Sequence, residues 1–374
     1  MSVRRAIVEM VPSTLSVSEF CEQHGVSRWL FYDLRKRYAV EGEAALVPRS
    51  RAPKRVANRT PPQVEDRIVE LRKELADGGW DCGPATIRFH LAGEGIVTSE
   101  STVWRVLTRR GFVTPEPRKR PRPPVHRFAA ERANECWQID STHWQLADGT
   151  PVEIINVIDD CTRVCVASVA VTTCTTPAAL DALARGAAVW GWPERVLSDN
   201  GLAFRGPGGT GGIIPALHAL GIRDTHSRPY HPQTCGKVER FHKTQKLHLD
   251  SLPPAATIAD LQAQLDAHTD RYNHHRPHRS IGRKTPAAAW HATPRSGPST
   301  TPIGTPTSTH RLTVDTNGQI SIGNRLRISL GAAHTGKTSL LVITGSNAHV
   351  FIDGRLTRQL TIDPNKRNHP LPRA

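Results

Sequence analysis

Three acidic residues, far apart in the sequence, place the strongest constraint on how this chain folds. They are Asp140, Asp199 and Glu239, and their positions differ by 59 (199 − 140) and by 40 (239 − 199). Carboxylates are the hard oxygen ligands that suit Mg²⁺ or Mn²⁺, and two such ions about 4 Å apart can clamp both reacting oxygens of a phosphodiester. The segments between the acids must therefore fold into strands and helices that return to one sheet edge. The pattern predicts phosphoryl transfer on nucleic acid.

The residues around these acids form motifs that occur in a fixed order. They are Trp137-Gln138-Ile139-Asp140, Ser198-Asp199-Asn200-Gly201, His231-Pro232-Gln233-Thr234, Gly236-Lys237-Val238-Glu239-Arg240-Phe241-His242, and Tyr272-Asn273 with Arg276-Pro277-His278. Together they resemble the DDE integrase core of bacterial insertion-sequence transposases in the retroviral-integrase superfamily. The resemblance implies a ribonuclease H-like fold. It also implies that Asp140, Asp199 and Glu239 are catalytic and bind two Mg²⁺ or Mn²⁺ ions.

The spacing departs from the family pattern at one place. Between Asp199 and Glu239 lie 39 residues (239 − 199 − 1), a few more than the superfamily commonly has. The glycine-rich stretch from Arg205 to Gly212 is the expected position of the insertion. Glu239 is still the predicted third acid, because it is the only Glu between Asp199 and Asp250.

The overall charge favours a polyanionic partner. The formal net charge is +15 and the sequence pI is about 10.0, so nucleic acid is the first candidate, with an undirected basic surface as the alternative. No apolar run approaches the roughly 18 residues of a membrane span. The seven cysteines contain no Cys-x-x-Cys pair, which argues against structural zinc. We expect a protein of the bacterial cytoplasm, associated with the nucleoid.

Residues 1–50 predict a helix-turn-helix domain. Segments 17–22 and 27–38 have helical patterns around Gly25, and Trp29, Leu30 and Leu34 are expected to face inward. The second helix of such a unit enters the major groove with its N-terminal residues. The predicted DNA-contacting residues are therefore Ser27, Arg28, Phe31 and Tyr32. A helical hairpin with no role in DNA binding would have the same pattern.

Residues 58–113 predict a second helix-turn-helix domain. A helix begins near Pro61 with Val64, Ile68, Leu71 and Leu75 at helical spacing, and helices at 84–91 and 101–107 follow. Tandem domains predict a long, bipartite DNA site. Residues 114–129 form a linker rich in proline and arginine, whose predicted phosphate contacts are Arg118, Lys119 and Arg120.

Residues 130–293 predict the catalytic core, an α/β fold on a mixed five-stranded sheet. Strands are expected at 136–141, 152–158 and 164–171, followed by a helix at 177–190, a short strand at 195–197, a helix at 214–220, a strand near Ile222 and the helix that carries Glu239. Further predicted DNA contacts in this core are His231, Gln233, Lys237, Arg240, Lys243 and Lys246. The alternative for Lys243 and Lys246 is a solvated charged face. The alternative for His231 and Gln233 is a role in capping the helix that begins at Thr234. His274, His275 and His278 have arginine neighbours, which disfavours a metal site there.

The C-terminal part of the sequence predicts a linker at 294–308 and a small all-β barrel at 309–374. Gly331 to Thr338 matches the G-x-x-x-x-G-K-[ST] phosphate-binding pattern, but a β-like run follows Lys337 where a phosphate loop requires a helix. We therefore predict no ATP site there. The barrel is expected to bind DNA or another subunit.

The predicted function is a DDE transposase that binds transposon ends and catalyses metal-dependent DNA cleavage and strand transfer. We expect residues 1–113 to select the ends, and double-stranded DNA of the ends and the target to be the partners. We also expect a homo-oligomer on DNA, with a helper ATPase as a further candidate partner. The alternatives are a catalytically inactive DNA-binding regulator and a metal-dependent nuclease that does not join DNA.

Overall fold

The protein is described by a computed structural model that covers residues 2–11, 15–49, 59–113, 129–226 and 236–372. The chain divides into two compact units, residues 1–60 and 61–374. Five predicted DNA contacts lie outside the described residues: Arg118, Lys119, Arg120, His231 and Gln233. Where the structure describes the chain, no helix is both long and apolar enough to cross a membrane.

The first unit is helical. It contains α1 (Val3–Glu9), α2 (Val17–Gln23), α3 (Arg28–Glu41) and the 3₁₀ helix η1 (Gly42–Leu46). The Ser16 side chain caps the N-terminus of α2 by accepting a hydrogen bond from the Glu19 backbone N–H. The Ser27 side chain caps α3 in the same way by accepting from the Leu30 backbone N–H. This confirms the predicted helix-turn-helix arrangement.

The inward face of α3 differs from the predicted one. Trp29 is 72% exposed, whereas Phe31 is 1% exposed and packs edge-on against Phe20 at a ring centroid distance of 5.6 Å. The buried stripe therefore runs through Phe31 and Leu34. Because Phe31 belongs to the core, its side chain is not accessible for the predicted contact with DNA.

The second unit begins with three helices, α4 (Pro62–Asp77), α5 (Pro84–Gly93) and α6 (Glu100–Arg109). Ile68, Leu71 and Leu75 line the buried face of α4 as predicted. Their apolar cluster continues into the helices of the core domain. Trp80 joins the two parts, because its ring stacks on His268 with centroids 5.1 Å apart. Gly79 approaches helix α10 (Gly236–Leu249) so closely that a Cβ at Gly79 would lie 2.2 Å from the Leu247 carbonyl oxygen.

The core domain has a mixed sheet in the order β3-β2-β1-β4-β5. Strands β1 (Cys136–Gln145), β2 (Pro151–Asp159) and β3 (Cys165–Val171) pair antiparallel, while β4 (Arg195–Ser198) and β5 (Arg223–His226) continue the sheet in parallel from β1. The five-stranded sheet was predicted, and the strand assignments are confirmed.

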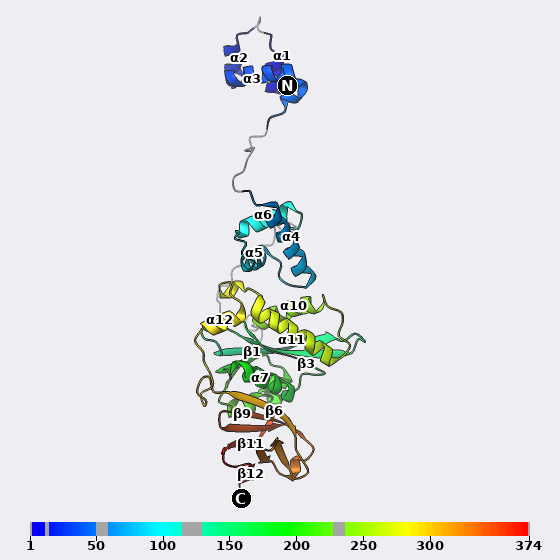
Figure 1. Ribbon diagram of the computed structural model, residues 1–374, viewed down its shortest axis with the longest axis vertical. Helices are drawn as coiled ribbons and strands as arrows, with labels where there is room; N and C mark the ends of the chain where they lie inside the picture. Colours follow the sequence, from blue (N-terminus) through cyan, green and yellow to red (C-terminus); the bar gives the residue numbers. More distant parts are fainter. Residues whose placement is uncertain (1, 12–14, 50–58, 114–128, 227–235, 373–374) are drawn as a thin grey trace. The chain divides into compact units, whose positions relative to one another are not determined.

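Helices cover both faces of this sheet (Figure 1). Helix α7 (Thr176–Trp190) packs on one face through Leu180, Leu183 and Ala187. The opposite face carries α10 (Gly236–Leu249) and α11 (Ile258–His275). The connecting elements are α8 (Leu202–Arg205), η2 (Pro207–Gly209), α9 (Ile214–Ala219), η3 (Arg279–Ile281) and α12 (Pro286–Ala292).

The C-terminal part is all β, as predicted. It forms one sheet in the order β11-β10-β9-β6 and another in the order β12-β8-β7, and both contribute to one apolar core. The strands are β6 (Thr307–Thr313), β7 (Gln319–Ile322), β8 (Leu326–Ser329), β9 (Thr338–Thr344), β10 (Asn347–Ile352), β11 (Arg355–Thr361) and β12 (Asn368–His369), with the 3₁₀ helix η4 (Ala332–His334) before β9. Strand β9 begins directly after Lys337, so the phosphate-loop lookalike has a strand where ATP binding would need a helix.

The segment before β6 packs against the core domain despite its linker-like composition. The Ser299 backbone N–H donates to the Gly221 carbonyl at 3.1 Å, and the Thr300 hydroxyl donates to the Leu220 carbonyl at 3.1 Å. Val342 and Phe351 of the C-terminal sheets join the apolar cluster around α7. The described residues of the second unit therefore share continuous packing.

Candidate active site

The pairing of two parallel strands places the first two acids side by side. The β1–β4 register runs from Cys136↔Arg195 to Ile139↔Ser198. Asp140 and Asp199 are the next residues on the two strands, at the point where β4 ends. Each carboxylate accepts a local backbone hydrogen bond, from Ser141 at 2.8 Å for Asp140 and from Gly201 at 2.9 Å for Asp199. Register and these local bonds thus orient both side chains.

A buried polar group fixes the start of α10, the helix that carries Glu239. We call Gln138, Asp160 and Lys237 the α10 clamp. The Gln138 side chain accepts from the Val238 backbone N–H at 3.3 Å and donates to Asp160 Oδ1 at 2.6 Å. The Lys237 ammonium forms an ion pair with the same Asp160 oxygen. Because Gln138 is two residues before Asp140 on β1, the clamp ties the first turn of α10 to the strand that carries the first acid.

The three acids influence one another electrostatically. Burial raises the pKa of Asp140 to about 6, and the negative charges of Asp199 and, more weakly, Glu239 add to the rise. The Ser141 backbone N–H opposes this rise in the Asp140 pKa by stabilising the carboxylate. A cation placed among these carboxylates would relieve their repulsion, so the donor set fits Mg²⁺ or Mn²⁺.

The acids do not form a ready-made metal site. Within the described ranges of the chain, no three His, Cys, Asp or Glu side chains are grouped closely enough to hold an ion. Glu239 lies in the first turn of α10, three residues after its first residue, Gly236. The three acids thus form a negatively charged corner, to which β1, the end of β4 and the first turn of α10 each contribute one carboxylate.

His242 belongs to this corner, although sequence analysis did not select it. Its Nδ1 lies 3.8 Å from Asp140 Oδ2, and its side chain is almost fully buried. Burial, with a smaller effect from Lys246, lowers the pKa of His242 to about 4, so the ring is neutral at pH 7. The available signal was its position three residues after Glu239, on the same helix face.

The predicted basic contacts on α10 have different surroundings. Lys243 is exposed and Lys246 is half-buried beside His143 and Trp144. Arg240 is exposed at the edge of a cavity, and Lys237 is held by Asp160. The ion pair with Asp160 competes with the predicted contact between Lys237 and DNA.

The predicted contacts on α3 also differ in accessibility. Tyr32 is 60% exposed and Arg28 is exposed, with its guanidinium near the Ser18 hydroxyl. The Ser27 hydroxyl is engaged in capping α3. Trp29 is an exposed aromatic side chain on the same helix that sequence analysis had assigned to the core.

Comparison with known protein families agrees with this arrangement. Residues 130–232 and 220–286 match two integrase core domain families. The chain carries an integrase core. Residues 3–54 match a helix-turn-helix domain, and residues 30–107 match a homeodomain-like domain. An integrase core behind DNA-binding helical domains makes this chain an enzyme of the transposase and integrase class.

Solved structures with remote similarity include retroviral integrases. One is the intasome of simian T-cell lymphotropic virus in complex with a regulatory subunit, at 20% identity and a TM-score of 0.39, covering 76% of this chain and 96% of that chain. Another is the HTLV-2 integrase catalytic core domain in complex with magnesium in a trimeric form, at 18% identity and a TM-score of 0.34. The match covers 42% of this chain and 97% of that chain. The dimeric form of that domain matches at 18% identity and a TM-score of 0.33, and the match covers 43% of this chain and 98% of that chain.

Proposed function

We propose that this chain is a DDE transposase that binds the ends of a DNA element and catalyses divalent-metal-dependent cleavage and strand transfer. The observation that carries the proposal is the β1–β4 register, which puts Asp140 beside Asp199 in a chain with an integrase core. Glu239, on α10, is the proposed third carboxylate, and its negative charge adds to the rise in the pKa of Asp140. The proposed metal ligands are these three acids.

Each residue of the corner has a proposed role. When bound, one or two Mg²⁺ or Mn²⁺ ions would stabilise charge on the attacking and leaving oxygens. Asp140, Asp199 and Glu239 would hold these ions. His242 remains neutral beside Asp140 and adds no positive charge that would compete with them. Lys246 and Lys243, seven and four residues after Glu239, supply cations for the phosphates next to the reacting one.

The DNA-binding domains are proposed to select the element ends. Arg28 and Tyr32, with the exposed Trp29, form the proposed contact face of α3. We also propose that the chain works as a homo-oligomer on DNA in the bacterial nucleoid. We propose no helper ATPase among its partners.

Substitution of each acid tests the proposed chemistry. Asp140→Asn, Asp199→Asn and Glu239→Gln keep the side-chain shape and remove the charge that binds Mg²⁺. Each is expected to abolish cleavage and joining of oligonucleotides that carry the terminal repeats, while DNA binding stays nearly unchanged. Asp250→Asn is the matched control, since this exposed acid lies just beyond α10 and should keep full activity.

The same assay separates the competing functions. Nicking without joining by the wild-type chain would indicate a nuclease, and binding without nicking would indicate a regulator. Ca²⁺, which accepts looser geometry, should allow assembly on DNA without turnover. Near-normal strand transfer by Glu239→Gln would show that another residue is the third ligand.

Removal of residues 1–60 tests end selection without disturbing the packing of residues 61–374. The shortened chain should lose preference for the terminal repeats and keep salt-sensitive, sequence-independent binding. Equal selectivity of the shortened and full chains would contradict the role proposed for α3.

A further inference from the structure

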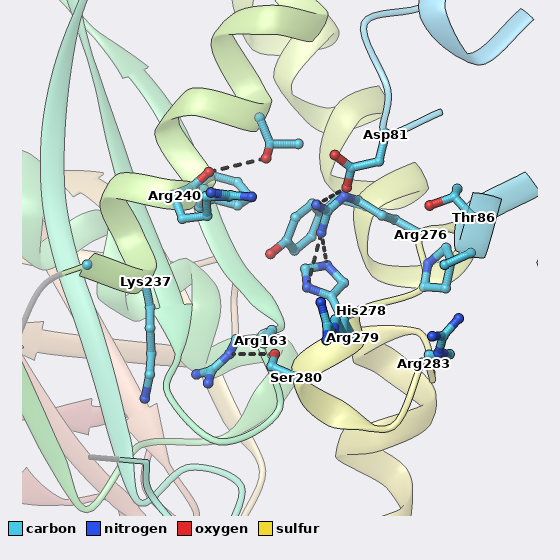
Figure 2. A pocket seen from close by; sticks show the side chains of 16 residues that line it. Asp81, Thr86, Arg163, Lys237, Arg240, Arg276, His278, Arg279, Ser280 and Arg283 are labelled. Carbon is cyan, nitrogen blue, oxygen red and sulfur yellow. Dashed lines mark hydrogen bonds and ion pairs between the residues drawn. The ribbon is translucent and has the colours of Figure 1, made fainter. Parts of the chain in front are cut away.

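A cavity of about 410 Å³ lies where the second helical domain meets the core domain. Its wall on the helical side includes Asp81 and, in the first turn of α5, Thr86. Its wall on the core side comes from the start of α10, the β2–β3 turn and the chain after α11 (Figure 2). The cavity thus joins segments that are far apart in the sequence.

Cationic side chains dominate this cavity. Asp81 is the only acid among the lining residues. The six cationic residues that line the cavity are Arg163, Lys237, Arg240, Arg276, Arg279 and Arg283. Lys237 pairs with Asp160, Arg276 with Asp81 and Arg283 with Glu100. For Arg240 and Arg279 the described part of the chain provides no acidic partner. The cavity therefore has an excess of positive charge that an anionic ligand would balance.

The surrounding structure holds part of this charge in place. Arg276 lies over the Tyr272 ring at 5.3 Å, and its guanidinium contacts both Asp81 and His278. Burial and the charge of Arg276 lower the pKa of His278 to about 2, so this ring stays neutral. Arg163 hydrogen-bonds the Ser280 hydroxyl at 3.4 Å from a backbone with φ of +68°. Fixed guanidinium groups lose little entropy when they bind phosphate.

The cavity is next to the candidate active site. Glu239 and Arg240 are consecutive residues of α10, so their side chains project about 100° apart around the same helix turn. Glu239 interacts with Asp140, while Arg240 lines the cavity. A DNA strand that crosses the start of α10 would therefore meet the acids and the cavity within a short stretch of backbone.

We infer that this cavity binds a backbone phosphate of DNA, with Arg279 and Arg240 as its contacting residues and Arg276 and Arg163 as fixed neighbours. The inference rests on the proposed function, because its ligand is the DNA on which the candidate active site acts. The site would place the DNA strand against both the helical domain and the core domain.

The test measures how DNA affinity depends on salt. Full-length wild type, Arg279→Ala, Arg240→Ala and Lys284→Ala are titrated with a fluorescent duplex of arbitrary sequence over a range of KCl concentrations. Lys284 is the matched control, an exposed cation five residues from Arg279 that does not line the cavity. Each lost phosphate contact should reduce the slope of log K against log[salt] by about 0.9. We expect this loss for Arg279→Ala and Arg240→Ala, with several-fold weaker binding, and an unchanged slope for Lys284→Ala.

Two further arms decide what the cavity binds. Repeating the titrations in the Asp140→Asn background separates this inference from the proposed chemistry, because the slope change should persist without cleavage. Calorimetry with inorganic triphosphate tests for a small anion instead. Triphosphate binding that Arg279→Ala abolishes, with an unchanged DNA slope, would overturn the DNA assignment. Equal slopes for all four proteins without triphosphate binding would overturn the site itself.

Discussion

Removing the Asp160 carboxylate should loosen the helix that carries Glu239. Asp160 is 6% exposed and accepts hydrogen bonds from the Ala130 backbone N–H at 2.7 Å and from Gln138 at 2.6 Å, besides its ion pair with Lys237. Loss of one partner of a buried ion pair costs about 3 to 5 kcal/mol. Lys237 is 22% exposed, so solvent screening favours the lower end of this range. Asp160→Ala should lower the free energy of unfolding by about 3 kcal/mol.

A double-mutant cycle assigns part of this free energy to the ion pair. Lys237→Met keeps the aliphatic stem and removes the charge, and Asp160→Asn keeps the shape of the acid. We expect the double variant to be less destabilised than the sum of the two single variants, by about 2 kcal/mol. Urea unfolding of the full chain measures these differences.

Hydrogen exchange locates the effect. About 3 kcal/mol corresponds to roughly a hundredfold change in an opening equilibrium, so the first turn of α10 should exchange much faster in Asp160→Ala. Asp266→Ala serves as the control, because this acid is exposed and accepts a surface hydrogen bond from Gln262. A change below about 1 kcal/mol with unaltered exchange in α10 would refute the clamp.

Three further predictions concern other parts of the second unit. Trp80→Ala should destabilise the packing of residues 61–113 on the core domain by about 3 to 5 kcal/mol. Limited proteolysis should then cleave these helices earlier than in the wild type, and unchanged cleavage would contradict the prediction. Burial lowers the pKa of His268 to about 3 in the folded protein, compared with 6.5 in the unfolded chain. As the pH falls below about 6.5, His268 is protonated in the unfolded chain but not in the folded protein, so the free energy of unfolding decreases. In His268→Phe, the free energy of unfolding should fall by about 2 kcal/mol less than in the wild type between pH 7 and pH 5. Urea unfolding at the two pH values measures this difference. The same pH dependence in the wild type and the variant would contradict the prediction. Lys337→Ala should leave DNA joining intact, and calorimetry should detect no ATP binding; stoichiometric binding lost in this variant would reverse the interpretation.

The sequence was sufficient where a local pattern determines the structure. The strands at 136–145, 151–159 and 165–171 alternate or run apolar between clear turns, and α7 has apolar residues at helical spacing. Asp140 and Asp199 could be selected because each follows a β-rich run and lies in a recognisable motif. Their roles as metal ligands remain predictions.

The sequence was insufficient where packing between distant segments decides the outcome. Helix α3 has four large side chains in succession, from Trp29 to Tyr32, so its spacing does not fix which face is buried. Contact with Phe20 resolves this in favour of Phe31. The α10 clamp pairs Asp160 with Lys237 across 77 positions, and no local pattern announces such a pair.

The glycine-rich loop after α8 is closed at its base, apart from the elements that carry the candidate acids. The Gly211 backbone N–H donates to the Arg205 carbonyl at 2.7 Å, and Ile213 donates to Phe204 at 3.0 Å, so the loop leaves and rejoins the fold at one point. The acids are fixed elsewhere, by strand register and by the α10 clamp. Residues 207–210 are thus the place where we expect an inserted reporter peptide to leave the β1–β4 register and the α10 clamp unchanged. We therefore expect this loop to tolerate a change in the number of residues between Asp199 and Glu239 without a change in the candidate active site.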